Sequence, residues 1–278
     1  MLSQNIGPLK VLACQVSVPR VQTPADRDVH VLALCDRIRQ YLDGTDAVDL
    51  IVLPELCTIE YSAGAFSHLD NLAEFIDGPS TQAFSQLAQE SGAMVVFGMA
   101  RSTKSGFAIS QLIVDSTGQM VDCYDKMHLC HYGTSTEKDF FQAGERIVFV
   151  DLKGWRIAPI ICYDIRIPEL SRTLAVDHGV DLLLHCGAYF RDESFSSWHS
   201  FVITRAMENQ VYLLSLNRAG ADYGDSLFCP PWIDGDQPAQ YFDTQDEAFR
   251  HLGLDPALLL DVRSRYTFLK DRHLVYQC

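Results

Sequence analysis

Residues 158–170 read APIICYDIRIPEL, and this stretch indicates both a fold class and a chemistry. Its first half is apolar, and a cysteine, a tyrosine, an aspartate, an arginine and a proline then follow within residues 162–168. A short apolar run that ends at polar residues and a proline is typical of a buried strand. A structural thiol would account for Cys162 but not for the polar residues after it. The stretch therefore predicts a strand that delivers a nucleophilic cysteine at its end.

Composition indicates a single globular domain. The chain has 278 residues, of which 47% are hydrophobic, and its mean hydropathy is close to zero. Several α/β architectures reach this length as one unit, so we expect one domain over residues 1–278. The formal net charge of −14 and the pI of about 4.9 disfavour nucleic acid and anionic membranes as partners, because both repel a negative surface.

Nothing in the sequence predicts export or membrane insertion. No run approaches the roughly eighteen apolar residues of a membrane span, and the first residues lack a basic start followed by an apolar run. The nine cysteines are odd in number and irregularly spaced, and several lie within apolar runs. Such cysteines are typical of reduced thiols, so we expect a cytoplasmic protein.

Apolar runs alternate with amphipathic segments up to residue 217. The apolar runs predict buried strands at 9–18, 48–56, 94–100, 111–126 (a pair with a turn at 116–118), 155–162, 180–186 and 210–217. Periodicity and capping signals predict helices that start at Thr23-Pro24 and that cover 80–91, 168–178 and 195–209. This alternation favours sheets covered by helices. After residue 218 we expect irregular loops and then short segments at 258–262 and 265–269.

Three residues with reactive side chains sit where apolar runs end. Glu55 follows LIVLP, Lys126 closes VDCYDK, and Cys162 closes WRIAPIIC. Reactive groups on helix-covered sheets gather at strand ends, where loops expose them. We therefore expect these three side chains to share one site.

The segments around these residues resemble the signatures of a known family. LPEL at 53–56, YDKMHL at 124–129 and ICYDIRIPEL at 161–170 are similar to the three signature segments of the nitrilase superfamily, the carbon–nitrogen hydrolases. Flanking pieces extend the match over nearly the whole chain: FFQAGE, TRAMEN, GDSLFCPP and RSRYTFLKDRH.

The resemblance implies a fold, an assembly and a set of catalytic roles. The fold would be a four-layer αββα sandwich, two mixed β-sheets flanked by helices, assembled as a homodimer or higher homo-oligomer. Cys162 would be the nucleophile, Glu55 the general base and acid, and Lys126 the cation beside the oxyanion. Glu137 would be the acid that orients Lys126 or the substrate. The reaction would need no cofactor and no metal.

The chemistry requires such groups independently of the family. An amide is a poor electrophile, so attack by a thiolate divides hydrolysis into two easier steps through a thioester. A carboxylate in a dry pocket can accept the thiol proton and pass it to the leaving ammonia. Lys126 and the backbone N–H of Tyr163 would stabilise the oxyanion.

The residues after Cys162 favour an amidase branch. Nitrile-cleaving members typically carry Trp-Glu there, whereas this chain has Tyr163-Asp164 and resembles the amidase branches, among them the ω-amidases and the amidases that act on deaminated glutathione. The expected substrate is a small carboxamide, an ω-amidase type or a simple aliphatic or aromatic amide, with Tyr61, Arg166 and Tyr189 as candidate binding residues. An N-carbamoyl amino acid amidohydrolase and a nitrilase remain alternatives.

Arg166 has two interpretations that the sequence leaves open. It would be a bidentate partner for a substrate carboxylate, or a structural ion pair with Glu169 or Glu208, and we favour the second. Glu60, where the family usually has Gly, is expected to be a solvated loop residue in preference to an acid at the pocket mouth.

Three further interpretations are weaker. A papain-like enzyme would pair Cys162 with His185 or His199, but the sequence around Cys162 lacks that signature. A zinc site at Cys123, His128, Cys130 and His131 lacks the paired C-x2-C spacing. A non-catalytic scaffold on the same fold would be free to lose Glu55, Lys126 or Cys162, and all three are present.

Overall fold

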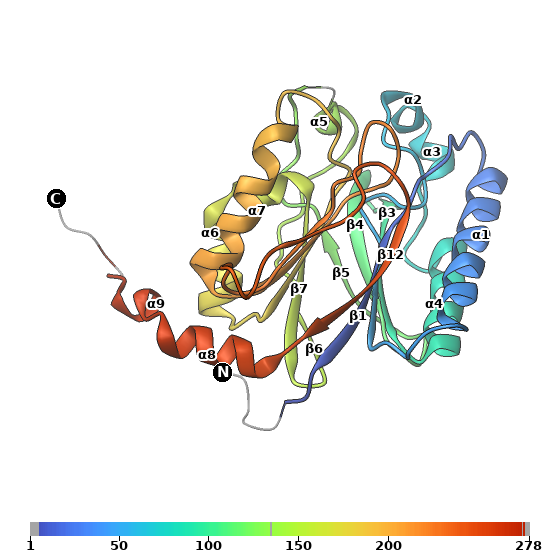
Figure 1. Cartoon of the computed structure of the whole chain (residues 1–278). Coiled ribbons are helices and arrows are strands. Elements are labelled where there is room, and N and C mark those ends of the chain that lie inside the picture. The colour runs from blue at the N-terminus through green and yellow to red at the C-terminus, as the bar shows by residue number, and fades with distance from the viewer. Residues whose placement is uncertain (1–5, 134, 274, 276–278) are drawn as a thin grey trace.

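The computed structural model describes residues 6–133, 135–273 and 275, and its strands form two six-stranded sheets. Figure 1 shows four layers, with α6 and α7 on one side, the two sheets between, and α1 and α4 on the other side. The predicted αββα sandwich with two mixed sheets is therefore confirmed.

The first sheet has the strand order β12-β1-β2-β3-β4-β5. β1, β2 and β3 run parallel, whereas β12, β4 and β5 each pair antiparallel with their neighbours. The strands are β1 (Leu9–Gln15), β2 (Leu50–Val52), β3 (Met94–Ser102), β4 (Phe107–Val114), β5 (Met120–Asp125) and β12 (Ala248–Leu254).

The second sheet repeats this plan with the order β11-β10-β9-β8-β7-β6. β7, β8 and β9 run parallel at its centre, and β6 and β10 flank them antiparallel. The strands are β6 (Val150–Leu152), β7 (Trp155–Ile161), β8 (Leu182–Cys186), β9 (Tyr212–Leu216), β10 (Leu227–Cys229) and β11 (Gln240–Tyr241).

The longest helices cover the outer faces of the sheets. Thr23 caps α1 as predicted: its side chain accepts from the N–H of Asp26, and the Asp26 carboxylate accepts from the N–H of Thr23. Described helices are α1 (Pro24–Leu42), α2 (Ala63–Phe66), α3 (Leu69–Leu72), α4 (Pro79–Ser91), α5 (Glu137–Phe140), α6 (Pro168–Arg172), α7 (Phe195–Asn209), α8 (Pro256–Arg265) and α9 (Phe268–Asp271). No helix among the described residues is long and apolar enough to cross a membrane.

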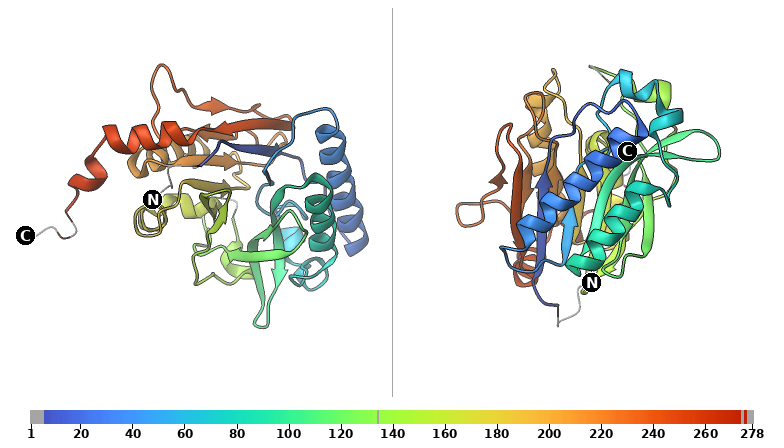
Figure 2. Two further views of the ribbon diagram at one scale, coloured as in Figure 1. Left: turned by 90° about the horizontal axis from the view of Figure 1, so that it is seen from below. Right: turned by 90° about the vertical axis from the view of Figure 1, so that its right-hand side faces the viewer.

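One expectation for the local structure was confirmed and one was wrong. The segment predicted as a helix over 168–178 is helical, with α6 continuing directly into a turn of π-helix at Thr173–Asp177. The C-terminal region is not mainly irregular, because β12 pairs with β1 over seven residues and α8 follows it directly. Figure 2 shows α8 and α9 projecting from the body of the sandwich.

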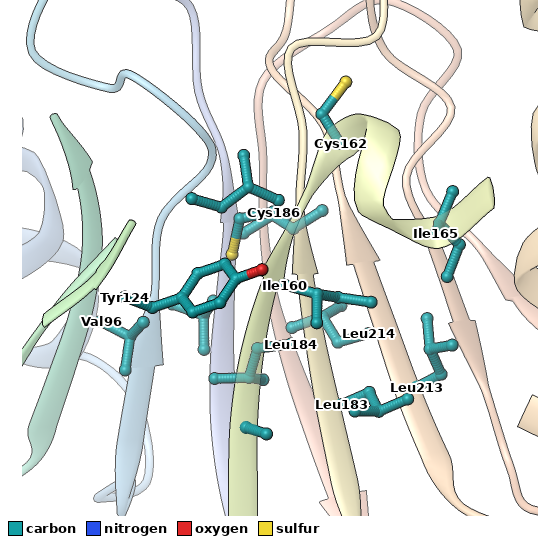
Figure 3. Packing of buried hydrophobic residues seen from close by; sticks show 14 of the residues in the cluster. Val96, Tyr124, Ile160, Cys162, Ile165, Leu183, Leu184, Cys186, Leu213 and Leu214 are labelled. Atoms are coloured by element: carbon teal, nitrogen blue, oxygen red, sulfur yellow. The ribbon is translucent and has the colours of Figure 1, made fainter. Parts of the chain in front are cut away.

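The inner faces of the two sheets share one apolar core. A single cluster of buried side chains includes Val11 and Val96 of the first sheet together with Ile160 and Leu184 of the second. Figure 3 shows part of this cluster, with Val96 and Tyr124 facing residues of β7, β8 and β9. Because neither sheet has a separate inner core, we propose that the chain folds as one domain, as the sequence predicts.

Candidate active site

Four strand ends meet at one edge of the sandwich. Glu55 lies three residues beyond β2, Lys126 directly follows β5, Cys162 directly follows β7, and Ala188 lies two residues beyond β8. The parallel strands within each sheet end at the same edge, so loops far apart in sequence become neighbours there. This topology brings together the three residues that the sequence placed at strand ends.

The turn that carries Glu55 is held by tight backbone packing. Leu56 has a positive φ of 49°, a conformation that few non-glycine residues adopt. A Cβ on Gly98 of β3 would lie 2.6 Å from the Leu56 nitrogen, so a glycine is needed where this turn packs on the strand. The buried guanidinium of Arg218 donates to the carbonyl oxygens of Glu55 at 3.1 Å, of Ile59 at 2.8 Å, and of Leu56.

Lys126 lies between two carboxylates in the interior. Its Nζ is 2.9 Å from Glu55 Oε1 and 2.6 Å from Glu137 Oε1, and all three side chains are 0% exposed. Burial opposes the charge on Lys126, but Glu137 and Glu55 together raise its pKa well above the usual value, so it stays an ammonium. Burial, reinforced by the charge of Glu137 and opposed by Lys126, raises the pKa of Glu55. A carboxyl with a raised pKa beside a fixed cation is suited to both accepting and donating a proton.

Further donors fix the orientation of both carboxylates. Glu55 Oε2 accepts from the Ala188 N–H at 2.7 Å, and Glu137 Oε2 accepts from the Cys130 N–H at 2.8 Å. Tyr61 donates its hydroxyl to Glu137 Oε1 at 2.7 Å. The predicted acid Glu137 thus contacts the predicted lysine directly.

Cys162 begins a 3-10 helix (Cys162–Arg166) with a φ of 45°. Its carbonyl oxygen accepts from the His185 ring at 2.9 Å and from the Tyr189 hydroxyl at 3.1 Å. Figure 3 shows the sulfur pointing away from the packed core. Burial and then the charge of Glu55 raise the pKa of the thiol, whereas Lys126 lowers it. The positive φ and the two hydrogen bonds to the carbonyl oxygen fix the backbone from which the thiol projects.

Asp164 connects the cysteine turn to the lysine segment, a role that the sequence did not reveal. Its Oδ1 accepts from the N–H of His128 at 3.0 Å and contacts the His128 ring at 2.7 Å. Its Oδ2 accepts from the Tyr124 hydroxyl at 2.7 Å and from the Ile161 N–H at 2.9 Å. Asp164 is fully buried, so it is a positioning residue that holds Cys162 and Lys126 in register.

A small cavity opens beside the thiol. It is lined by Tyr61, Cys130, Tyr132, Ser135, Cys162, Tyr163, Ala188, Tyr189, Phe190, Asp192 and Ser194. Two of the three candidate substrate-binding residues, Tyr61 and Tyr189, are in this lining. Tyr163 also lines it, and its N–H belongs to the first turn of the 3-10 helix, where N–H groups lack helical partners.

Arg166 does not line the cavity and forms no ion pair among the described residues, so the expected pair with Glu169 or Glu208 was wrong. Its guanidinium donates to the Ser194 carbonyl at 3.2 Å and to the Ser197 hydroxyl at 3.3 Å, and it lies 4.7 Å from the Phe201 ring. The two glutamates were plausible from sequence distance, but Glu208 instead pairs with Arg172 and Arg205.

The environment of Glu60 differs from a solvated loop. Its carboxylate accepts from the Val21 N–H at 2.7 Å, and its side chain is half-buried outside the cavity that contains Cys162. A glutamate at this position therefore fastens the segment before α1 to the loop that carries Glu55.

The geometry disfavours the papain-like alternative. His185 contacts the backbone oxygen of Cys162, and its other ring nitrogen contacts the Ser215 hydroxyl at 2.7 Å. Burial lowers the pKa of His185 to about 4, so the ring is neutral and serves as a fixed donor. His199 contacts the Asp225 carbonyl at 2.7 Å. Within the described part of the chain, no group of three potential ligands is arranged to hold a metal ion.

Comparison with known families agrees with this geometry. The sequence profile of the carbon–nitrogen hydrolase family matches residues 13–235. The chain belongs to the carbon–nitrogen hydrolase family. This membership confirms the nitrilase-superfamily resemblance of the three motif segments.

Named relatives place this carbon–nitrogen hydrolase beside amidases. It is 33% identical to omega-amidase YafV of Escherichia coli K12 over 181 residues, which span 65% of this chain and 66%, just under two thirds, of that relative. It is 30% identical to an (R)-stereoselective amidase of a Pseudomonas species over 82% of this chain and 80% of the relative. Both relatives are named amidases.

A solved structure has the same architecture. A CN-hydrolase superfamily protein from Xanthomonas campestris, with an arsenic adduct in its active site, superposes with a TM-score of 0.82 at 26% identity. The superposition covers 98% of this chain and 100% of that one.

Proposed function

We propose that this carbon–nitrogen hydrolase cleaves a small primary carboxamide through a thioester on Cys162. The observation that supports the proposal is the position of Lys126 Nζ, 2.9 Å from Glu55 and 2.6 Å from Glu137, in a buried cluster whose charges act on the Cys162 thiol. The proposal assigns Glu55 as the base, Lys126 as the cation and Cys162 as the nucleophile.

In the first half-reaction the Cys162 sulfur attacks the amide carbon while Glu55 takes the thiol proton. The carbonyl oxygen gains negative charge, which Lys126 and the N–H of Tyr163 stabilise. Collapse of the tetrahedral intermediate breaks the C–N bond. Glu55 returns the proton to the nitrogen, and ammonia leaves.

In the second half-reaction water attacks the thioester carbon. Glu55 takes a proton from the water, the C–S bond breaks, and the sulfur recovers the proton. The products are a carboxylic acid and ammonia, so each residue ends as it began and no redox step occurs. Glu137 holds Lys126 in place and accepts from Tyr61, which keeps the cation beside the reacting oxygen.

An ammonia-release panel tests this function. It compares simple aliphatic and aromatic amides, α-ketoglutaramate, N-carbamoyl amino acids and nitriles, with Cys162→Ala as the blank. Turnover of amides that disappears in the Cys162→Ala protein supports the proposal. If the protein hydrolyses only nitriles or only N-carbamoyl amino acids, the proposed substrate class is wrong. If the Cys162→Ala protein also releases ammonia, Cys162 is not the nucleophile.

We also propose a cytoplasmic homo-oligomer that acts on a small molecule. The eight cysteines of the described residues are all free, which suits a reducing compartment. Light scattering on the purified protein tests the assembly, and a monomeric mass would contradict it.

A further inference from the structure

The rim of the cavity carries a carboxylate that no cation neutralises. Asp192 lies in the cavity lining together with Cys162, in the loop before α7. Its Oδ1 accepts from the Ser194 N–H at 2.8 Å, and it forms no ion pair within the described ranges. A Cβ on Gly133 would collide with its Oδ2, so the carboxylate lies against Gly133.

The side chains around this carboxylate suit an organic cation. Five aromatic side chains belong to the same lining: Tyr61, Tyr132, Tyr163, Tyr189 and Phe190. No lysine, arginine or histidine is among the lining residues. A carboxylate together with aromatic rings is the environment in which proteins hold ammonium groups.

Two arginines, Arg191 and Arg166, contact the loop that carries Asp192 or belong to it. Arg191 pairs with Asp225 at 2.8 Å and stacks on the Phe195 ring at 4.4 Å. Arg166 donates to Ser194 and Ser197, lies 4.7 Å from the Phe201 ring and 6.0 Å from the Tyr132 ring, and keeps a buried Nε without a hydrogen-bond partner among the described residues. Neither arginine belongs to the cavity lining.

The base of the site adds no attraction for an anion. Lys126 is the only cation in the buried cluster, and Glu55 and Glu137 flank it, so their formal charges sum to −1. The whole chain carries −14. A substrate with a second negative group would meet negative charge both at the rim and at depth.

We propose that Asp192 selects amides that carry an ammonium group at the end opposite to the carboxamide. This proposal rests on the proposed amidase function and specifies its substrate class. Asp192 would hold the ammonium by a charge-assisted hydrogen bond while the carboxamide reaches Cys162. The preference is opposite to that of an enzyme for dicarboxylic acid monoamides.

Three amides of matched length test the proposal: 4-aminobutanamide, pentanamide and the monoamide of glutaric acid. We expect kcat/KM to fall in that order, with the ammonium amide at least about tenfold above the neutral one. In Asp192→Asn the ratio of the ammonium amide to the neutral amide should fall about tenfold, and the monoamide of glutaric acid should gain. Asparagine retains the Oδ1 acceptor for Ser194, so the loop keeps its hydrogen bond.

Glu193→Gln is the matched control, because Glu193 is exposed, adjacent and absent from the cavity lining. It should leave the ratio unchanged. If Asp192→Asn also leaves the ratio unchanged, or if the wild-type enzyme prefers the monoamide of glutaric acid, the inference is overturned while Cys162-dependent hydrolysis of pentanamide stands. If no amide is hydrolysed, the proposed function itself fails.

Discussion

The floor and the mouth of the site are built differently. The floor is Glu55, Lys126, Glu137 and Cys162, and the mouth is Tyr132, Ser135, Asp192 and Ser194. Floor side chains are buried and fixed by backbone donors from distant loops, such as the N–H groups of Ala188 and Cys130. Mouth side chains are half-exposed and lie on two loops.

This difference separates reaction from specificity. A buried cluster of three charges tolerates little movement, because each group depends on the others for compensation. The floor therefore fixes the chemistry. Loops at a rim accept substitution at little cost in stability, so the mouth can change substrate without altering the reaction.

The largest effect should come from the floor itself. Glu55→Gln and Lys126→Ala should each lower kcat/KM by at least about a hundredfold, since each removes a positioned proton carrier or an oxyanion partner. Lys126→Ala should also lower the melting temperature, because it leaves two buried carboxylates without a cation. Lys138→Ala, an exposed lysine beside Glu137, is the control and should remain active. If kcat/KM of the folded Glu55→Gln and Lys126→Ala proteins falls by less than about threefold, these residues do not have the catalytic roles that we assign to the floor.

A smaller effect should follow from weakening the hydrogen bonds of Asp164, which connect the Cys162 turn to the Lys126 segment. Asp164→Asn replaces one of the two acceptor oxygens with an N–H2 group that faces existing donors. We expect unfolding to become easier by about 2–4 kcal/mol and kcat to fall about tenfold. Denaturant unfolding and steady-state kinetics measure the two changes.

Tyr124→Phe is the graded control for Asp164, because it removes only one of the donors to this carboxylate. Its cost should be about 1 kcal/mol. Equal effects from the two variants would show that Asp164 does not act as the common anchor.

The smallest effect concerns pH. The hydrogen bond to Asp164 raises the pKa of His128 above its ordinary value, although burial opposes the change. A raised folded-state pKa stabilises the protein fully below the unfolded value near about 6.5, and this stabilisation is lost as pH rises through the folded value. The gap in melting temperature between wild type and His128→Gln should be larger, by about 1–3 °C, near about pH 5.5 than near about pH 9. A gap that widens at alkaline pH would contradict the charged pair.

The sequence predicted three of the four floor residues because each of them ends a recognisable run, whereas Glu137 was expected only from the family resemblance. Glu55, Lys126 and Cys162 follow apolar strands, and such strand ends converge by topology. The supports were not predictable in this way. Arg218 binds carbonyl groups about 160 positions earlier in the chain, and nothing local marks that contact.

Strand β12 near the C-terminus shows a second limit of prediction from the sequence. Residues 248–254 read AFRHLGL, with Arg250, His251 and Gly253 interrupting the apolar pattern. Strand propensity is weak there, yet β12 forms because β1 offers a free edge far earlier in the chain. Arg166 shows a third limit, since sequence distance suggested glutamate partners whereas the fold supplies serines and an aromatic ring.

The central claim is that Cys162 carries the acyl group between two half-reactions. Glu55→Gln should retard release of that group, because no base remains to activate water. This variant is mixed with an amide that the wild-type enzyme hydrolyses. Intact-protein mass spectrometry should then show the added mass of one acyl group, and peptide mapping should locate that group on Cys162. An unmodified Cys162 at every time point while ammonia is released, or an acyl group on another residue, would contradict the account.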